Sequence, residues 1–263
     1  MKKLSLLSLT MVVVGGMWAH AGGVLLTYAE SPGQQTTTLS NASWINFDNA
    51  FVGSSTAQTN FAWSGVGTYD SISIIPANQY GGAGGSGYYA VQSQSVGAKV
   101  VTTTLTLDTP SSYFGLWWSA GDAKNRMQFY SGASLIADFS TQVLLNVLPT
   151  TYSGNPNPSF LGQNSGERYA FLNIYSNSGT TFDRIVFSND GSSGFESDNH
   201  TVRAAAWGTL PGEDGPPPGI PVANIDGTTV STVAVPETET WLMGFVAFAL
   251  VLFAFRRRPE MAR

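Results

Sequence analysis

The sequence predicts an all-β protein, a two-sheet antiparallel β-sandwich of jelly-roll type over residues 22–207. Three observations predict it. Glycine, serine and threonine are abundant, with 29, 29 and 25 residues, whereas charged residues make up only 11%. Short apolar segments recur with turn residues between them. No internal repeat of the kind that indicates a propeller or a β-helix is present.

Several of the apolar segments alternate with the period of a strand. The clearest is 99–107, where Val101, Thr103 and Leu105 share one face and threonines occupy the other. Segment 168–176 is apolar on both faces, which predicts a central strand. Residues 141–148 are expected to form one short helix. The ten predicted strands are 44–51, 68–75, 87–94, 99–107, 113–119, 125–130, 134–139, 168–176, 181–188 and 194–206.

Aromatic side chains on the predicted sheet suggest a carbohydrate-binding surface. Trp117 and Trp118 are adjacent in one strand and must point to opposite faces, so one of them is expected in the core and the other outside or under a loop. Tyr113 lies in the same strand, and Tyr80 flanks a glycine-rich loop. These four are the candidate ligand-binding residues. The alternative is that they fill the interior of the sandwich.

A calcium site is a second candidate, and it is the single cofactor that the sequence suggests. Glu196 and Asp198 share a strand face by alternation, and Asn199 follows them. Carboxylate and amide oxygens are the ligands that calcium prefers. The alternative is an ordinary solvent-facing strand, or an aspartate paired with an arginine.

Catalysis has little support. The chain has no cysteine and two histidines, His20 and His200, so a Ser-His-Asp triad would need His200. Paired carboxylates could cleave glycosides, and Glu167, Glu196, Asp183 and Asp198 are available. With so many acidic residues, chance pairs are expected, and no catalytic residue is predicted.

Charge excludes one class of partner. Residues 22–235 contain six basic and fourteen acidic residues, hence a net charge of −8. A surface this acidic has no basic patch for nucleic acid.

Both ends read as targeting segments. Residues 1–21 have two lysines, an apolar run and a small-residue cleavage site, as in a signal peptide read by the Sec translocon and signal peptidase. Residues 208–234 are rich in proline and glycine and are expected to be a linker. Residues 241–255 are apolar and predict a short transmembrane helix of about 22 Å. The arginines that follow place the body outside the cytoplasm.

The C-terminal residues have a specific order within 235–260: a Val-Pro-Glu element, a tryptophan and a glycine, an apolar stretch and an arginine cluster. They are Val235, Pro236, Glu237, Trp241, Gly244, Arg256, Arg257 and Arg258. This order resembles the PEP-CTERM sorting signal of exosortase-dependent surface proteins. The resemblance implies an exosortase as partner, cleavage near the Pro-Glu element, and a Gram-negative host that makes extracellular polysaccharide.

The body carries the same resemblance. An aromatic strand from Phe114 leads through a Gly/Ser/Asp turn to Tyr130, and the segments Phe182–Ser188 and Phe195–Asn199 resemble the last two strands of that group. The resemblance implies a lectin-like or carbohydrate-module-like sandwich.

We therefore expect a non-enzymatic protein, anchored in the inner membrane as a precursor and then exposed at the cell surface or in the matrix, where it contacts polysaccharide. Two alternatives stay open: a secreted glycan-active enzyme held at the surface, and a purely structural coat or adhesion protein.

Overall fold

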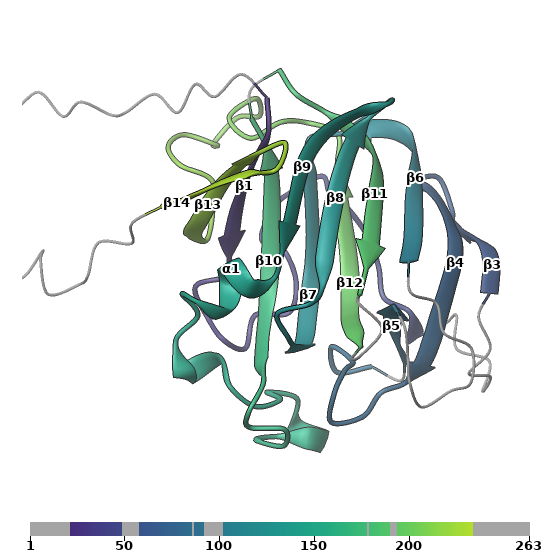
Figure 1. The fold of residues 1–263 in the computed structure, drawn as a ribbon, viewed down its shortest axis with the longest axis vertical. Helices are drawn as coiled ribbons and strands as arrows, with labels where there is room; N and C mark the ends of the chain where they lie inside the picture. The colour runs from purple at the N-terminus through teal and green to yellow at the C-terminus, as the bar shows by residue number, and fades with distance from the viewer. Residues whose placement is uncertain are drawn as a thin grey trace, which may run out of the picture.

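The computed structural model describes residues 22–48, 58–85, 87–91, 102–177, 179–189 and 194–233, with 87–91 described as backbone only. The described chain is mainly β (Figure 1). Its strands are β1 (Val24–Tyr28), β2 (Ser43–Ile45), β3 (Gln58–Trp63), β4 (Gly67–Pro76), β5 (Gly87–Val91), β6 (Thr102–Ser111), β7 (Tyr113–Gly121), β8 (Arg126–Ser131), β9 (Ser134–Ser140), β10 (Arg168–Ser176), β11 (Phe182–Ser188), β12 (Phe195–Arg203), β13 (Ile220–Asp226) and β14 (Thr229–Thr232). Helix α1 (Gln142–Leu145) and the 3-10 turns η3 (Thr150–Tyr152) and η4 (Pro158–Phe160) lie between β9 and β10.

The strands form two antiparallel sheets that share β4. One sheet runs β14-β13-β1-β10-β7-β12-β5, with β2 beside β12. The other runs β4-β6-β11-β8-β9, with β3 beside β4. Strand β4 pairs with β6 through residues 67–69 and with β5 through residues 73–76, so it passes from one sheet into the other. The two-sheet antiparallel sandwich predicted from the sequence is confirmed.

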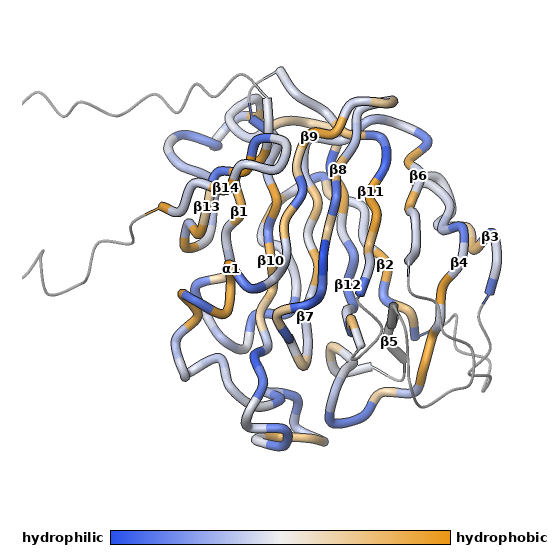
Figure 2. The backbone as a smooth tube through the Cα atoms, viewed as in Figure 1, coloured by the Kyte–Doolittle hydropathy of each residue, from blue (hydrophilic) through white to orange (hydrophobic). Residues whose placement is uncertain are grey.

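The core lies between the sheets and is dominated by aromatic and branched side chains. Trp118, Phe114 and Leu116 of β7 point into it, and so do Phe129 of β8 and Ile185 of β11. The predicted alternation of β6 is confirmed, since Thr103, Leu105 and Leu107 are buried while Thr106 is exposed. Figure 2 shows apolar residues concentrated along the strands, with more polar residues in many of the connecting loops. Alternation therefore selects the face of each strand that is buried.

The outer face of the β10-β7-β12 region is also buried. Trp117, Tyr169 and Phe171 form a second apolar cluster there, together with Ala29 and Ala120. Loops cover this cluster: the Tyr169 hydroxyl donates to the Gln79 carbonyl at 2.6 Å, and the Asn157 amide donates to the Gly82 carbonyl. Strand β10 is apolar on both faces for this reason, as the sequence predicts.

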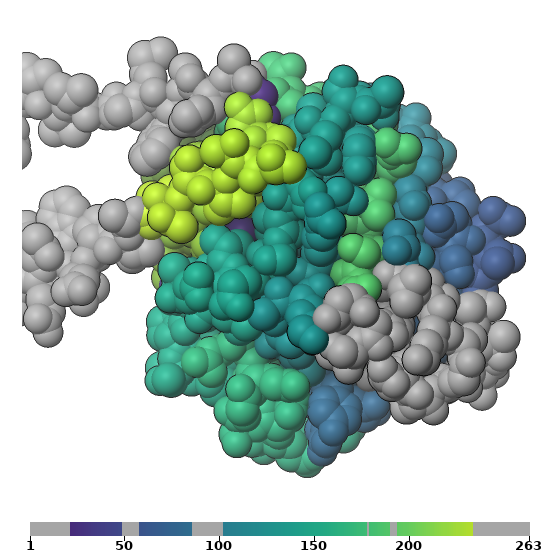
Figure 3. Space-filling view, in the orientation of Figure 1, coloured from purple at the N-terminus to yellow at the C-terminus, as the bar shows by residue number. Residues whose placement is uncertain are grey.

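The segment 208–234 was predicted to be a linker, but its described residues 208–233 belong to the fold and do not form a stalk. Strand β13 pairs with β1 and β14 pairs with β13, which extends the first sheet by a hairpin. Val222 and Ile225 are fully buried. Figure 3 shows this hairpin, in yellow-green, against the teal part of the body. The prolines lie ahead of the hairpin or at its first positions, where they cost no central ladder bond.

The hairpin also joins the two sheets at their far edges. Asp138 N–H of β9 donates to the Gly227 carbonyl at 2.7 Å, and Gly227 N–H donates to the Ile136 carbonyl at 2.9 Å. Gly227 has a φ of 55°, which suits glycine at the tip of a tight hairpin. The sandwich is thus linked through β4 on one side and through the β13-β14 tip on the other.

Nine of the ten predicted strands match observed strands, and the first, 44–51, matches at its start, where β2 ends at Ile45. Residues 49–51, 92–94 and 99–101 of the predicted strands lie outside the described residues. Strands β1, β3, β13 and β14 were not predicted. The predicted helix is shorter than expected and forms α1. The signal peptide at 1–21 and the sorting signal at 235–260, including 241–255, lie outside the described residues. Within the described part, no helix is long and apolar enough to cross a membrane.

The role of the C-terminal hairpin can be tested by truncation. A chain of residues 22–207 lacks β13 and β14 and also Glu213, which pairs with the buried Arg203. Two fully buried aliphatic side chains are lost, each worth about 1.5–3 kcal/mol, so the free energy of unfolding should fall by at least about 3 kcal/mol. Urea unfolding of this chain and of residues 22–233 as control measures the difference. Equal stability of the two chains would support the alternative interpretation, in which the segment after residue 207 is a linker that does not stabilise the fold.

Candidate functional site

His200 lies in the core and does not form a catalytic site. Its ring is fully buried, 2.8 Å from Ser197 Oγ through Nε2 and 2.9 Å from the Tyr69 hydroxyl through Nδ1. Phe187 stacks on it, and Phe47 and Phe114 contact it edge-on. Burial lowers the pKa of His200 to about 3, so the imidazole is neutral. The Ser-His contact is closed to substrate and serves to satisfy buried polar atoms.

Three of the four predicted ligand-binding aromatics are not available to a surface ligand. Tyr113, Trp117 and Trp118 are at most 1% exposed. Trp118 points into the core and donates from Nε1 to Asn125 Oδ1 at 2.9 Å, while Trp117 lies in the outer cluster. The two rings do point to opposite faces as predicted, but loops cover the outer one. Only Tyr80, 43% exposed, keeps an accessible ring.

The three predicted calcium ligands serve different contacts. Asp198 accepts the backbone N–H of Ala83 and of Asn199, each at 2.7 Å. Asn199 donates from its amide to the Gln35 carbonyl at 2.8 Å. Glu196 lies further along β12, opposite Ser119 of β7. Among the residues that the structure describes, no group of three acidic or histidine side chains is arranged to hold a metal ion.

Burial has a strong effect on the two carboxyls of β12. It raises the pKa of Glu196 to about 8, and the nearby charges of Glu167 and Asp122 add to this. It raises the pKa of Asp198 to about 6, with a contribution from Asp48 and against the backbone N–H groups that Asp198 accepts. Glu196 is therefore mainly protonated at neutral pH.

These shifts predict the pH dependence of stability. A carboxyl whose pKa is higher in the folded chain binds its proton more tightly there, so the stability it adds is present below about pH 4 and is lost as the pH rises through about 6 and about 8. The melting temperature should fall between pH 5 and pH 9. Glu196→Gln should flatten the upper part of this slope and raise the free energy of unfolding at pH 9, by up to about 5 kcal/mol for a pKa raised from 4.5 to about 8.

Thermal unfolding at a series of pH values measures this effect. Glu30→Gln, the same change at an exposed position, is the matched control and should keep the wild-type slope. If the melting temperature of Glu196→Gln fell with pH as steeply as that of the wild type, the raised pKa of Glu196 would be contradicted.

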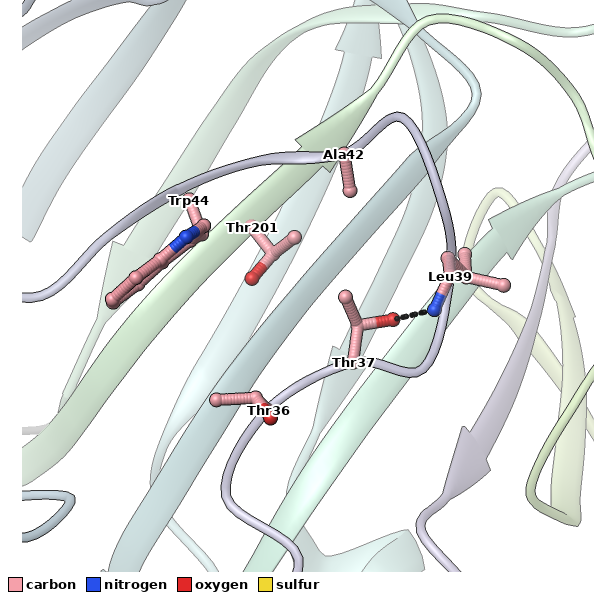
Figure 4. A pocket seen from close by; sticks show the side chains of 6 residues that line it. All are labelled: Thr36, Thr37, Leu39, Ala42, Trp44 and Thr201. Atoms are coloured by element: carbon pink, nitrogen blue, oxygen red, sulfur yellow. Dashed lines mark hydrogen bonds between the residues drawn. The ribbon is translucent and has the colours of Figure 1, made fainter.

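An open groove lies on the outer side of β12, beside the covered cluster. It has a volume of about 310 Å³ and is lined by Thr36, Thr37, Leu39, Ala42, Trp44 and Thr201 (Figure 4). Strand β2 pairs with β12 and sets Trp44 opposite Thr201. Trp44 is 57% exposed, the highest value among the tryptophans of the described chain. The groove thus combines an accessible indole ring with threonine hydroxyls.

The loop that forms one wall of the groove is anchored at Gln35 and has one hydrogen bond within itself. Gln35 accepts from the Asn199 amide through its carbonyl and donates from Nε2 to Asn157 Oδ1 at 2.6 Å. Thr37 Oγ1 accepts the Leu39 N–H at 3.1 Å, the bond drawn in Figure 4. Asn199 has a φ of 49° at a register shift between β12 and β7, which directs its amide to the loop. The wall is therefore preformed.

Sequence reasoning missed this groove. Trp44 falls at the start of a predicted strand and is not among the predicted ligand-binding aromatics. Alternation is the signal that could have found it: Trp44 shares a strand face with the polar Asn46, whereas Ile45 and Phe47 share the other face, which is the more apolar one.

Comparison with known proteins adds little. No protein family and no curated protein matches the sequence. One solved structure matches, a variant catalytic domain of a GH87 alpha-1,3-glucanase in complex with tetrasaccharides, at 13% identity and a TM-score of 0.30. The match covers 70% of this chain and 29% of the other, so the chain spans less than a third of that protein's length. A similarity this weak supports no conclusion about function.

Proposed function

We propose that this protein is a non-enzymatic, exported cell-surface or matrix protein whose β-sandwich contacts polysaccharide. The observation that carries the proposal is the groove beside Trp44. Ligand sites commonly have volumes from about 300 Å³ upward, with apolar walls and a few fixed polar groups. The groove meets this description with a volume of about 310 Å³.

The chemistry of the groove suits a sugar ring. An indole face covers the C–H side of a pyranose, and it loses little conformational entropy on binding because tryptophan has two rotatable bonds. The hydroxyls of Thr36 and Thr37 are placed to form hydrogen bonds with sugar hydroxyls. The lectin-like, jelly-roll classification of the sandwich is part of the same proposal.

The route to the surface is proposed from the sequence. Residues 1–21 direct the chain to the Sec translocon and signal peptidase, and residues 241–255 hold the precursor in the inner membrane of a Gram-negative bacterium. An exosortase then acts at Val235-Pro236-Glu237. Because the last described strand ends at Thr232, this cut would leave the sandwich whole.

Binding is tested through Trp44. Trp44→Ala removes the exposed ring without touching the core, so polysaccharide affinity should fall at least about tenfold while the melting temperature stays near that of the wild type. Glycan-array binding followed by calorimetry on the full-length protein measures this effect. Leu161→Ala removes a side chain that is 71% exposed elsewhere on the surface and should bind as the wild type does. If Trp44→Ala bound polysaccharide as tightly as the wild type, the groove would not be the binding site.

Processing is tested on surface material. Mass spectrometry of the mature protein should find a C-terminus near residue 236, and Pro236→Ala with Glu237→Ala should leave the precursor in the inner-membrane fraction. An intact Arg263 in surface material would contradict processing.

A glycan-active enzyme is the second candidate, and one observation favours it. Glu196 is protonated at neutral pH, as a general acid must be, and it lies near the carboxylate of Glu167. Opposite it, the buried Ser119 hydroxyl has no partner within the described part of the chain. Polysaccharide hydrolysis that both Glu196→Gln and Glu167→Gln abolish would establish this function. A glycan array with no binding would favour a purely structural coat or adhesion protein.

A further inference from the structure

We infer that the groove beside Trp44 selects uncharged, hydroxyl-rich carbohydrate and discriminates against anionic polysaccharide. The inference rests on the proposed function and deepens it, because it names the chemical class of the ligand. It follows from the direction of the hydrogen bonds behind the groove wall and from the residue types that line the groove.

The direction of these bonds can be traced from the far end of a buried chain. Thr27 Oγ1 donates its proton to the Pro218 carbonyl at 3.0 Å, because a carbonyl can only accept. Thr27 Oγ1 must therefore accept from Asn173, at 3.2 Å, and the atom of Asn173 that faces it is Nδ2. This fixes the orientation of the Asn173 amide and leaves Oδ1 on its other side.

The hydrogen bonds continue from Asn173 to the groove, and each direction follows from the one before. Asn173 Oδ1 can only accept, so it takes the single proton of the Tyr113 hydroxyl, 2.8 Å away. Thr37 Oγ1 lies 3.0 Å from the same hydroxyl and must donate to it. Thr37 in turn accepts the Leu39 N–H. Thr37 has therefore used its proton inside the protein, and it offers a ligand a lone pair only.

The other described groups of the groove offer few donors to an anion and no charged one. Thr201 donates to the Asn199 carbonyl at 3.0 Å and is 1% exposed, so it closes the floor. The Leu39 N–H is occupied by Thr37. Leu39 and Ala42 are apolar, and no lysine or arginine is among the described lining residues. Among the side chains of the described lining residues, the Thr36 hydroxyl and the Trp44 indole N–H are the two donors that can turn toward an acceptor.

This polarity separates the two classes of polysaccharide. A carboxylate or sulfate gives up hydration on entering the groove and needs cationic or several converging donors in return, and the described lining has no lysine or arginine. A neutral sugar brings O–H donors for Thr37 and a C–H face for Trp44. The net charge of −8 over residues 22–235 adds a repulsion that salt screens. The shortage of hydrogen-bond donors in the groove is a local property, so, unlike the repulsion, it is not removed by high salt.

The test compares neutral and anionic glycans on the full-length protein. Short glucan, galactan and mannan oligosaccharides are measured against hexuronic acid oligomers and sulfated galactans of the same length, at low and high salt. At least one neutral class should bind, and the anionic ones should bind at least about tenfold more weakly, a difference of about 1.4 kcal/mol. The difference should persist at high salt.

A gain-of-binding variant makes the test sharper. Thr36 is exposed at the rim, so Thr36→Lys places an ammonium beside the groove without disturbing the fold. It should bring the affinities for anionic and neutral glycans closer together, whereas Thr36→Val should not. Thr37→Val should weaken neutral binding because it removes the lone pair.

The outcomes distinguish a failure of the selectivity from a failure of glycan binding itself. Anionic glycans that bind as tightly as neutral ones, with a loss in Trp44→Ala, would overturn the selectivity and leave the groove as a glycan site. Absence of binding to every glycan, or binding that Trp44→Ala does not weaken, would overturn the proposed function and the selectivity with it.

Discussion

Burial of the β10-β7-β12 region on both faces is the constraint on which the rest of the molecule depends. The inner face packs in the sandwich core, and loops cover the outer face around Trp117 and Phe171. Because no water reaches this outer face freely, polar groups there must pair or change their protonation state. The raised pKa values of Glu196 and Asp198 and the preformed loop over β12 are consequences of the same covering.

The covering also decides where a ligand can bind. Trp117 and Tyr113 are residue types that commonly bind sugars, but loops bury both of them. Trp44 lies beside the covered region, and its ring is accessible. Strand β2 has three residues and, in the part of the chain that the structure describes, pairs with β12. The side chain of Trp44 on this short strand is 57% exposed, and the loop 35–39 supplies the opposite wall of the groove.

The sequence predicted the fold class well because alternation reports burial on one face. It worked for β6 and β7, and it placed Trp117 and Trp118 on opposite faces. It failed for the C-terminal hairpin, since the prolines from Pro211 to Pro221 resemble a linker and the two strands are short. It also failed for the groove, because the covering of Trp117 and the exposure of Trp44 depend on loops whose path no local pattern specifies.

A chain of hydrogen bonds connects the two features that the sequence did not predict, the segment before the C-terminal hairpin and the groove. It runs from Thr37 at the groove through Tyr113, Asn173 and Thr27 to the carbonyl of Pro218. Pro218 lies in the segment that the sequence marks as a linker, yet its carbonyl is the acceptor that sets the direction of every bond in the chain. The segment before β13 therefore helps to set the polarity of the groove wall. A flexible stalk could not do this, because a mobile carbonyl would leave the Thr27 hydroxyl, and each hydroxyl after it, free to reverse.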